Sequence, residues 1–294
     1  MKRRISFLLI LLIILCLAGR SWAYEAAVLK SADIGPYNEA LEGFRSSCDC
    51  SVTTLTPDQD AVTSQIYRLH PDVVVAIGMD ALAKVRSVEN LPVIYVMVPA
   101  PLSDGEGRNI SGVSMYISPA KYLDAMTRLF PGAKRIGLVY DPNNSDAYVK
   151  EAMREAAARG IELVAEKAET SGSVPSLMDS LKERIDIFWM LPEPGLLNSA
   201  TVDYMLLFSF ESKVPIFTFS KKYVDMGAAA ALTVGSFDMG AQAGAISKRL
   251  HEAGAPGQIR VDARVSGIIV NSKVLRKLGI ESNKNTAGWA KNVD

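Results

Sequence analysis

The chain has 294 residues, of which 49% are apolar and 22% are charged, and its 32 basic residues balance its 32 acidic ones. This composition excludes a disordered chain or a fibre, and three cysteines are too few for a disulfide scaffold. The length favours two lobes over one, and without a basic excess the chain is a poor candidate for binding nucleic acid.

The first 23 residues have the pattern of a secretory signal peptide. Basic residues 2–4 precede an almost purely apolar run over 5–18, and Ser21 and Ala23 place small side chains at the −3 and −1 positions of a cleavage site. We predict export with cleavage after Ala23, which leaves a periplasmic mature chain of residues 24–294.

Two alternatives to a cleaved signal stay open. The run 5–18 can remain as an uncleaved anchor, although fourteen residues of helix span only about 21 Å of a hydrocarbon core of about 30 Å. A lipoprotein would use Cys16, but Leu15 stands where a small residue is expected. No later segment is long and apolar enough to span a bilayer.

Beyond residue 23 strands and helices alternate, and apolar runs such as 73–77 are typical of parallel strands covered on both faces. The predicted strands are 24–30, 51–55, 73–77, 92–98, 135–140, 161–166, 186–191, 214–219 and 228–234. The predicted helices are 37–45, 58–69, 80–88, 145–159, 175–184, 199–212 and 238–253. Two such series predict an α/β protein with two doubly wound parallel sheets, which bind ligands at the carboxyl ends of their strands.

Cys48 and Cys50 form a C-x-C pair between the first predicted helix and the second predicted strand. An oxidising compartment permits a disulfide, but the ring is tight enough that the thiols can equally stay reduced. A zinc site needs about four ligands, and no further Cys or His lies nearby, so we expect no metal site.

Motifs for catalysis or cofactor binding are missing from the chain. It lacks the G-x-S-x-G, G-x-x-x-x-G-K-[ST] and H-E-x-x-H patterns. The glycine-rich stretch 105–112 lacks the dinucleotide-binding spacing, and we expect it to be a loop. His70 and His251 are expected on the surface, and Glu151 and Glu155 on a solvated helix face. We therefore predict a protein that is not an enzyme and needs no cofactor.

Strand-end segments that recur in order along nearly the whole mature chain resemble ABC transporter substrate-binding proteins of the tryptophan/tyrosine-uptake type. The segments are 71–78, 91–95, 107–114, 135–142, 214–217, 227–228, 238–244, 270–271 and 278–280. Each segment is weak alone, and their ordered recurrence carries the resemblance.

The resemblance implies a type I periplasmic-binding-protein fold, in which two lobes joined by a three-crossing hinge close on a ligand in the cleft between them. Lobe 1 would comprise 24–116 and 237–263, and lobe 2 would comprise 117–236 and 264–294. The crossings would lie near 114–119, 235–238 and 263–266.

The resemblance also implies a function. It is that of an exported solute-binding component of an ABC importer, a monomer that takes an amino acid or a related organic molecule to a membrane permease. A sensing module that reports its ligand to a membrane receptor is the alternative, and an extracytoplasmic enzyme is a third.

The same resemblance places ligand contacts on the strand-end loops. In lobe 1 the matching positions are Tyr37, Met79, Asp80, Val98 and Pro99, with Tyr116 near the hinge. In lobe 2 they are Asp141, Asn143, Ser145, Pro192, Glu193 and Ser220, with Asp238 near the hinge. Tyr37, Met79 and Tyr116 can form an apolar wall, and Glu193 or Asp238 can pair with a ligand ammonium.

Helix N-termini after two of the strands offer a place for a ligand carboxylate, through amides after Gly78 and around Asn144 and Ser145. Some of the matching positions also have a purely structural alternative. These are Asp80, Ser145 and Asp238 as N-caps, Tyr116 as a packed hinge residue and Pro192 as a turn former.

Two loops depart from the family pattern. The loop 30–37 lacks the His-Pro pair common after the first strand, and Gly78-Met79-Asp80 replaces a turn that often contains Thr. The predicted fold and export do not depend on these loops, whereas the identity of the solute does. An aromatic amino acid as ligand therefore does not follow from the sequence.

Overall fold

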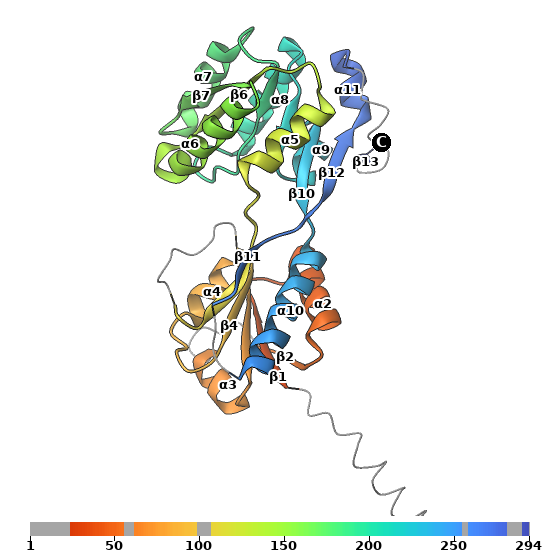
Figure 1. The fold of residues 1–294 in the computed structure, drawn as a ribbon. Helices are drawn as coiled ribbons and strands as arrows, with labels where there is room; N and C mark the ends of the chain where they lie inside the picture. The colour runs from red at the N-terminus through yellow and green to blue at the C-terminus, as the bar shows by residue number, and fades with distance from the viewer. Residues whose placement is uncertain (1–23, 56–61, 99–106, 255–257, 281–289, 294) are drawn as a thin grey trace, which may run out of the picture. The chain divides into compact units, whose positions relative to one another are not determined.

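The computed structural model describes residues 24–55, 62–98, 107–254, 258–280 and 290–293. The chain forms two compact units, one of Met1–Met115 with Ser236–Asp262 and the other of Tyr116–Gly235 with Ala263–Asp294. The chain therefore passes from one unit to the other three times. We call them unit 1 and unit 2 and describe each by itself (Figure 1).

Unit 1 is built on a six-stranded parallel sheet with the order β11-β5-β4-β3-β1-β2. Its strands are β1 (Glu25–Lys30), β2 (Ser51–Thr54), β3 (Val73–Ile77), β4 (Val93–Val98), β5 (Ile110–Ser114) and β11 (Arg260–Asp262). Every residue of β3 is buried, as expected for a central strand with both faces covered. β11 enters the sheet only after the chain has returned from unit 2, so the fold of unit 1 depends on both chain segments.

Helices cover both faces of this sheet (Figure 1). They are α2 (Gly35–Cys48), α3 (Val62–Leu69), α4 (Met79–Val85) and α10 (Ser236–Ala253). Apolar side chains of α3 and α4 share one core cluster with alternate residues of β1, β3 and β4. On the other side α2 and α10 lie side by side, because glycines at their contact let the two backbones approach closely.

Unit 2 is built on a seven-stranded sheet with the order β13-β12-β10-β9-β8-β6-β7. Its strands are β6 (Arg135–Tyr140), β7 (Glu162–Lys167), β8 (Ile187–Trp189), β9 (Ile216–Thr218), β10 (Ala230–Val234), β12 (Val265–Asn271) and β13 (Ala290–Val293). All pairs are parallel except β10 with β12. The two doubly wound sheets that we predicted are confirmed, and β12, a strand that we did not predict, pairs antiparallel with β10. This strand follows the third crossing directly, without a helix that would reverse its direction.

Unit 2 has helices on both faces as well. They are α5 (Pro119–Leu129), α6 (Pro142–Ala158), α7 (Val174–Leu181), α8 (Ser199–Ser212), α9 (Lys221–Met226) and α11 (Ser272–Leu278). Helices α5, α6 and α11 share a core cluster that contains Trp189, whereas α7 and α8 belong to a second cluster that contains Phe188. Trp189 and Phe188 are neighbours on β8, so their side chains point to opposite faces of the sheet.

The glycine-rich stretch corrects one prediction. Residues 110–112 of the expected loop belong to β5, which is wholly buried. A Cβ at Gly112 would lie 2.4 Å from the carbonyl oxygen of Tyr95, so this glycine serves close packing in a strand. Gly107, with φ of +62°, forms the turn before the strand, and residues 105–106 lie outside the described residues.

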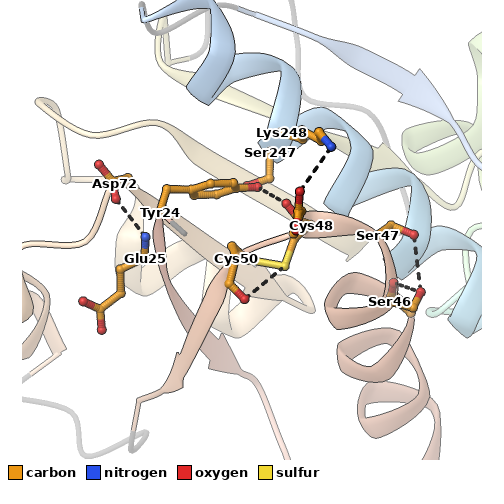
Figure 2. Close-up of a disulfide and its surroundings, with 11 residues drawn as sticks. Tyr24, Glu25, Ser46, Ser47, Cys48, Cys50, Asp72, Ser247 and Lys248 are labelled. Atoms are coloured by element: carbon orange, nitrogen blue, oxygen red, sulfur yellow. Dashed lines mark hydrogen bonds and ion pairs between the residues drawn. A yellow bond between two sulfur atoms is a disulfide. The ribbon is translucent and has the colours of Figure 1, made fainter. Parts of the chain in front are cut away.

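The structure also decides between the alternatives for Cys48 and Cys50, which form a disulfide (Figure 2). Asp49 between them has φ of +56° and ends α2 in the left-handed conformation. The hydroxyl of Tyr24 donates a hydrogen bond to the carbonyl of Cys48 (2.8 Å) and accepts one from the hydroxyl of Ser247 (2.9 Å). The disulfide-bonded end of α2 is thereby tied to α10 and to the residue before β1.

Both histidines are exposed, as predicted. His251 nevertheless packs its ring on that of Tyr24, with the ring centroids 4.4 Å apart. Burial raises the pKa of Tyr24 and outweighs the hydrogen bond with Ser247, so this phenol stays protonated at neutral pH.

Asp186, just before β8, forms hydrogen bonds and an ion pair with residues at the start of β6. Its carboxylate accepts hydrogen bonds from the backbone amides of Lys134 and Arg135 (both 2.9 Å) and from the Arg135 guanidinium (2.7 Å). Burial alone would raise the pKa of Asp186, but the bonds from Arg135 and the two amides outweigh it and lower that pKa. A carboxyl with a lowered pKa stabilises the folded state above its unfolded pKa, and this contribution is lost as the pH falls through the folded value.

We expect Asp186→Asn to lower the free energy of unfolding by about 1–2 kcal/mol at pH 7, because charge-assisted hydrogen bonds are lost while water screens the partly exposed pair. The difference from wild type should shrink as the pH falls below about 3.9, the unfolded pKa of Asp. Urea unfolding at several pH values measures it, with the exposed Asp203→Asn as control. A difference that stays constant with pH would contradict the role of the charge.

Candidate functional site

In unit 1 the turns after β1 and β3 lie against each other. The amide of Ser31 donates to the carbonyl of Ile77 (2.9 Å), and Ser31 Oγ accepts from the amide of Ala81 in α4 (2.9 Å). Gly78 has φ of +94°, and a Cβ there would lie 2.5 Å from Ser31 Oγ and 2.8 Å from Tyr37 Oη. The Tyr37 hydroxyl therefore lies beside the Gly78 turn, and only glycine fits at this position.

The first turn of α4 presents the two predicted contacts that follow Gly78. Met79 is 46% exposed and Asp80 is exposed as well. Asp80 lies inside the helix after the N-cap position, which Gly78 occupies, so the N-cap alternative for Asp80 is wrong. Gly78, Ala81 and Leu82 already use their amides in hydrogen bonds within unit 1.

The carboxyl end of β4 is irregular. Met97 has φ of +60°, and the register with β5 shifts between Val96 and Val98, which is a β-bulge. Bulges often re-aim the chain next to functional sites. The side chain of Val98 is fully buried, so this residue can offer only its backbone, while Pro99 lies outside the described residues.

Exposed apolar side chains gather at the same end of unit 1. Ile34, at the N-cap position of α2, and Phe237, in the first turn of α10, are each 46% exposed, like Met79. The sequence reasoning missed both, although an isoleucine where Ser, Thr, Asp or Asn usually stands is a detectable signal. Asp238, the neighbour of Phe237, is exposed within the helix and is not its N-cap.

In unit 2 the N-terminus of α6 is capped by its own chain. Asp141 Oδ1 accepts from the amide of Asn143 (2.9 Å), and the Asp141 carbonyl accepts from the amides of Asn144 and Ser145. The expectation that these amides are open to a ligand carboxylate is therefore wrong. Asp141 is the N-cap, whereas Ser145 lies inside the helix.

Glu193, after β8, is the most unusual of the predicted residues. It is only 2% exposed, and its Oε2 accepts a hydrogen bond of 2.6 Å from Asn144 Nδ2. Its Oε1 is buried and has no hydrogen-bond partner among the described residues. A Cβ at Gly195 would lie 3.9 Å from Asp141 Oδ2, so the loop that holds Glu193 lies against the α6 cap.

Asp141, Asn144, Ser145 and Glu193 thus come together, and we call them the Glu193 cluster. Asn144 also contacts Ser145 Oγ at 3.3 Å, so the side chains of Asn144, Ser145 and Glu193 form one network. Asn143 and Pro192 are exposed beside it. Of these residues, the sequence reasoning had assigned Asn144 only a backbone role.

Two other predicted residues of unit 2 have structural roles. Ser220 caps α9, with its Oγ accepting from the amide of Lys222. The Tyr116 hydroxyl donates to Glu151 (2.9 Å), and its ring packs edge-on against Tyr148. This supports the packed-residue alternative for Tyr116, and it corrects the prediction of a solvated face at Glu151, which is half-buried.

Two cavities lie away from the predicted residues. One of about 210 Å³ in unit 1 is lined by residues that include Asp72, Pro92 and His251. One of about 480 Å³ in unit 2 is lined by residues that include Lys121, Arg128 and Arg264. None of the thirteen predicted contacts lines either cavity.

The part of the chain that the structure describes contains neither a candidate metal site nor a candidate membrane-spanning helix. Within it, no three side chains among His, Cys, Asp and Glu are grouped so that they could hold a metal ion. None of its helices combines the length and the apolar character that crossing a bilayer requires.

The sequence pattern of the family described as ABC transporter substrate binding protein matches residues 54–293. A curated protein of Clostridioides difficile (strain R20291), described as a tyrosine-binding protein, is 26% identical over 236 residues. The match covers 76% of this chain and 68% of that relative.

Solved structures of low sequence identity share the fold. The ligand-free, open structure of a substrate-binding protein with adhesive properties from Clostridium difficile has a TM-score of 0.78 at 19% identity, covering 92% of this chain and 100% of that one. A domain from Streptococcus pneumonia in complex with L-Trp has a TM-score of 0.62 at 19% identity, with the same coverage.

The family match spans most of the chain, and the two units with three chain crossings have the architecture of the periplasmic binding proteins. The buried strands and strand-end turns that carried the sequence resemblance lie within the matched region. The chain belongs to the family of ABC transporter substrate-binding proteins and has a type I periplasmic-binding-protein fold.

Proposed function

We propose that this protein is the extracytoplasmic solute-binding component of an ABC importer, which binds an amino acid or a related organic molecule and delivers it unchanged to a membrane permease. Unit 1 and unit 2 are the two lobes, and the turns at the carboxyl ends of their strands supply the contacts. The family match over residues 54–293 carries the proposal. The names of the tyrosine-binding relative and of the L-Trp complex support an amino acid as the class of solute.

The proposed contacts are the thirteen residues predicted from the resemblance. They are Tyr37, Met79, Asp80, Val98, Pro99, Tyr116, Asp141, Asn143, Ser145, Pro192, Glu193, Ser220 and Asp238. The exposed side chains of Met79, Ile34 and Phe237 support an apolar contribution from unit 1. The buried carboxylate of Glu193 supports a polar contribution from unit 2.

Residues 1–23 act as the export signal in this proposal, and the mature chain begins at Tyr24. The contacts of the Tyr24 side chain with Cys48, Ser247 and His251 make this residue part of folded unit 1, which fits a mature chain that begins there. Expression of the full chain should place the protein in the periplasmic fraction, with an N-terminal sequence that starts at Tyr24. Retention in the cytosol with Met1 in place would contradict export.

Solute binding is tested by differential scanning fluorimetry of the purified mature protein against amino acids, amines and small organic acids, with small-angle scattering of any complex. We expect at least one solute to raise the melting temperature and to reduce the radius of gyration, because lobe closure follows ligand binding in this fold. Mass spectrometry should recover that solute unchanged. No stabilisation by any compound, or its conversion to a product, would contradict the proposal.

A further inference from the structure

The Glu193 cluster contains two carboxylates that meet no basic side chain. Glu193 Oε2 is held by Asn144 and Asp141 Oδ1 by the amide of Asn143, but no ion pair within the described residues involves either acid. Glu193 Oε1 is buried without any partner there. A buried charge is costly unless a donor or an opposite charge meets it, so this oxygen needs a donor that the described residues do not supply.

Three lysines of the helices α6 and α9 are engaged elsewhere. Lys150 pairs with Asp146 and Lys221 with Asp225, each at 2.7 Å, and Lys222 lies over the ring of Tyr223. On the corresponding turn of unit 1, Lys30 bonds to Asp33 and Asn38. None of these cations forms an ion pair with Glu193.

Backbone donors in unit 2 are similarly occupied. The first amides of α6 bond to Asp141, those of α9 to Ser220, and the N-terminus of α8 is closed by Asn198 and Thr201. At these three helix N-termini, within the described residues, the amides named are used by the chain itself, whereas Glu193 Oε1 stays open as an acceptor for a ligand cation. This balance differs from what a zwitterionic amino acid needs, since its carboxylate must also be satisfied.

We infer that the solute is an amine with a net positive charge, whose ammonium group binds Glu193 Oε1 beside Asp141, and that an α-carboxylate on the same carbon weakens binding. This inference rests on the proposed function and specifies the substrate class of the same site. An ammonium supplies up to three donors, enough for the open oxygen of Glu193 and a second acceptor of the cluster.

Matched pairs that differ only in the carboxylate test the inference on the wild-type protein, so no variant needs to fold. Tyrosine is compared with tyramine, tryptophan with tryptamine and lysine with cadaverine by isothermal titration calorimetry at pH 7. We expect at least one amine to bind at least tenfold more tightly than its amino acid. Binding in which no amine exceeds its own amino acid tenfold overturns the inference and leaves the proposed function standing. Failure of every compound to bind overturns both.

Glu193→Gln then tests the residue, using the amine that binds best. The substitution keeps the size of the side chain and its bond with Asn144 while removing the charge, and we expect a loss of affinity of at least tenfold. Glu169→Gln, an exposed change of the same charge after β7, is the matched control and should bind within twofold of wild type. Equal affinities of Glu193→Gln and wild type would overturn the assignment to Glu193.

Discussion

Gly240→Ala is expected to lower the free energy of unfolding of unit 1 by about 3 kcal/mol, at the upper end of what overpacking costs. A Cβ at Gly240 would lie 1.9 Å from the carbonyl oxygen of Ala40 and 2.9 Å from the amide nitrogen of Phe44. Both are backbone atoms of α2, so no rotamer change relieves the clash and the two helices must separate. Chemical denaturation monitored by circular dichroism measures the loss.

Gly35→Ala is the control for this substitution, because Gly35 lies in α2 as well but a Cβ there has no atom within 4 Å. We expect it to leave stability unchanged or to raise it by a few tenths of a kcal/mol, as alanine favours the helix more than glycine does. Similar losses for both variants would show that the separation of α2 and α10 is not what Gly240 controls.

The close contact of α2 with α10 joins two segments that lie far apart in the chain. Unit 1 takes α2 from its first segment and α10 from the segment that returns after unit 2. The contact therefore holds the segment Ser236–Asp262 against the first part of unit 1. The same segment contains β11, which pairs with β5 at the edge of the sheet. We therefore expect the loss of stability in Gly240→Ala to weaken the pairing of β11 with β5 as well.

The parts of the fold that the sequence predicted are those with strong local signals. The run 73–77 is apolar throughout and became a fully buried strand, and the helices that end at glycine or begin after proline were placed within a few residues. The missed elements include α5, α9, α11 and the strands β5, β11, β12 and β13. Several of them are short, and β11 to β13 are specified by pairing with distant strands rather than by their own pattern.

The candidate site shows where spacing along the chain stops being informative. Asp141 and Ser145 are both reasonable N-caps, and only the start of α6 decides that Asp141 has this role. Glu193 stands between two prolines in a polar turn, which suggests exposure, yet the loop turns back onto α6 and buries it. Burial of a single carboxylate depends on tertiary contacts such as the bond from Asn144, which no local pattern encodes.

Trp189→Ala is expected to lower the free energy of unfolding by about 3–5 kcal/mol, because it removes the largest of the fully buried side chains. The Trp189 ring packs against Tyr122 and Tyr148, with centroids 5.1 Å and 5.9 Å away, in the core shared by α5, α6 and α11. Burial raises the pKa of both tyrosines, so the neighbouring rings stay neutral over the pH range of the experiment. Urea unfolding of Trp189→Ala, with wild type alongside, measures the loss.

Trp189→Phe separates the packing of the ring from its polar atom. Trp189 Nε1 is buried and has no hydrogen-bond partner among the described residues, so phenylalanine removes a buried donor that gains nothing from the fold. The smaller ring leaves unfilled volume, which destabilises the fold, whereas removal of the unpaired N–H stabilises it. We expect the free energy of unfolding to fall by about 1 kcal/mol in total. Because Trp189 ends β8, four residues before Glu193, a phenylalanine that keeps the core intact should also keep solute affinity. A loss as large as that of alanine would mean that the indole N–H is satisfied in the folded protein and helps to hold the loop of Glu193.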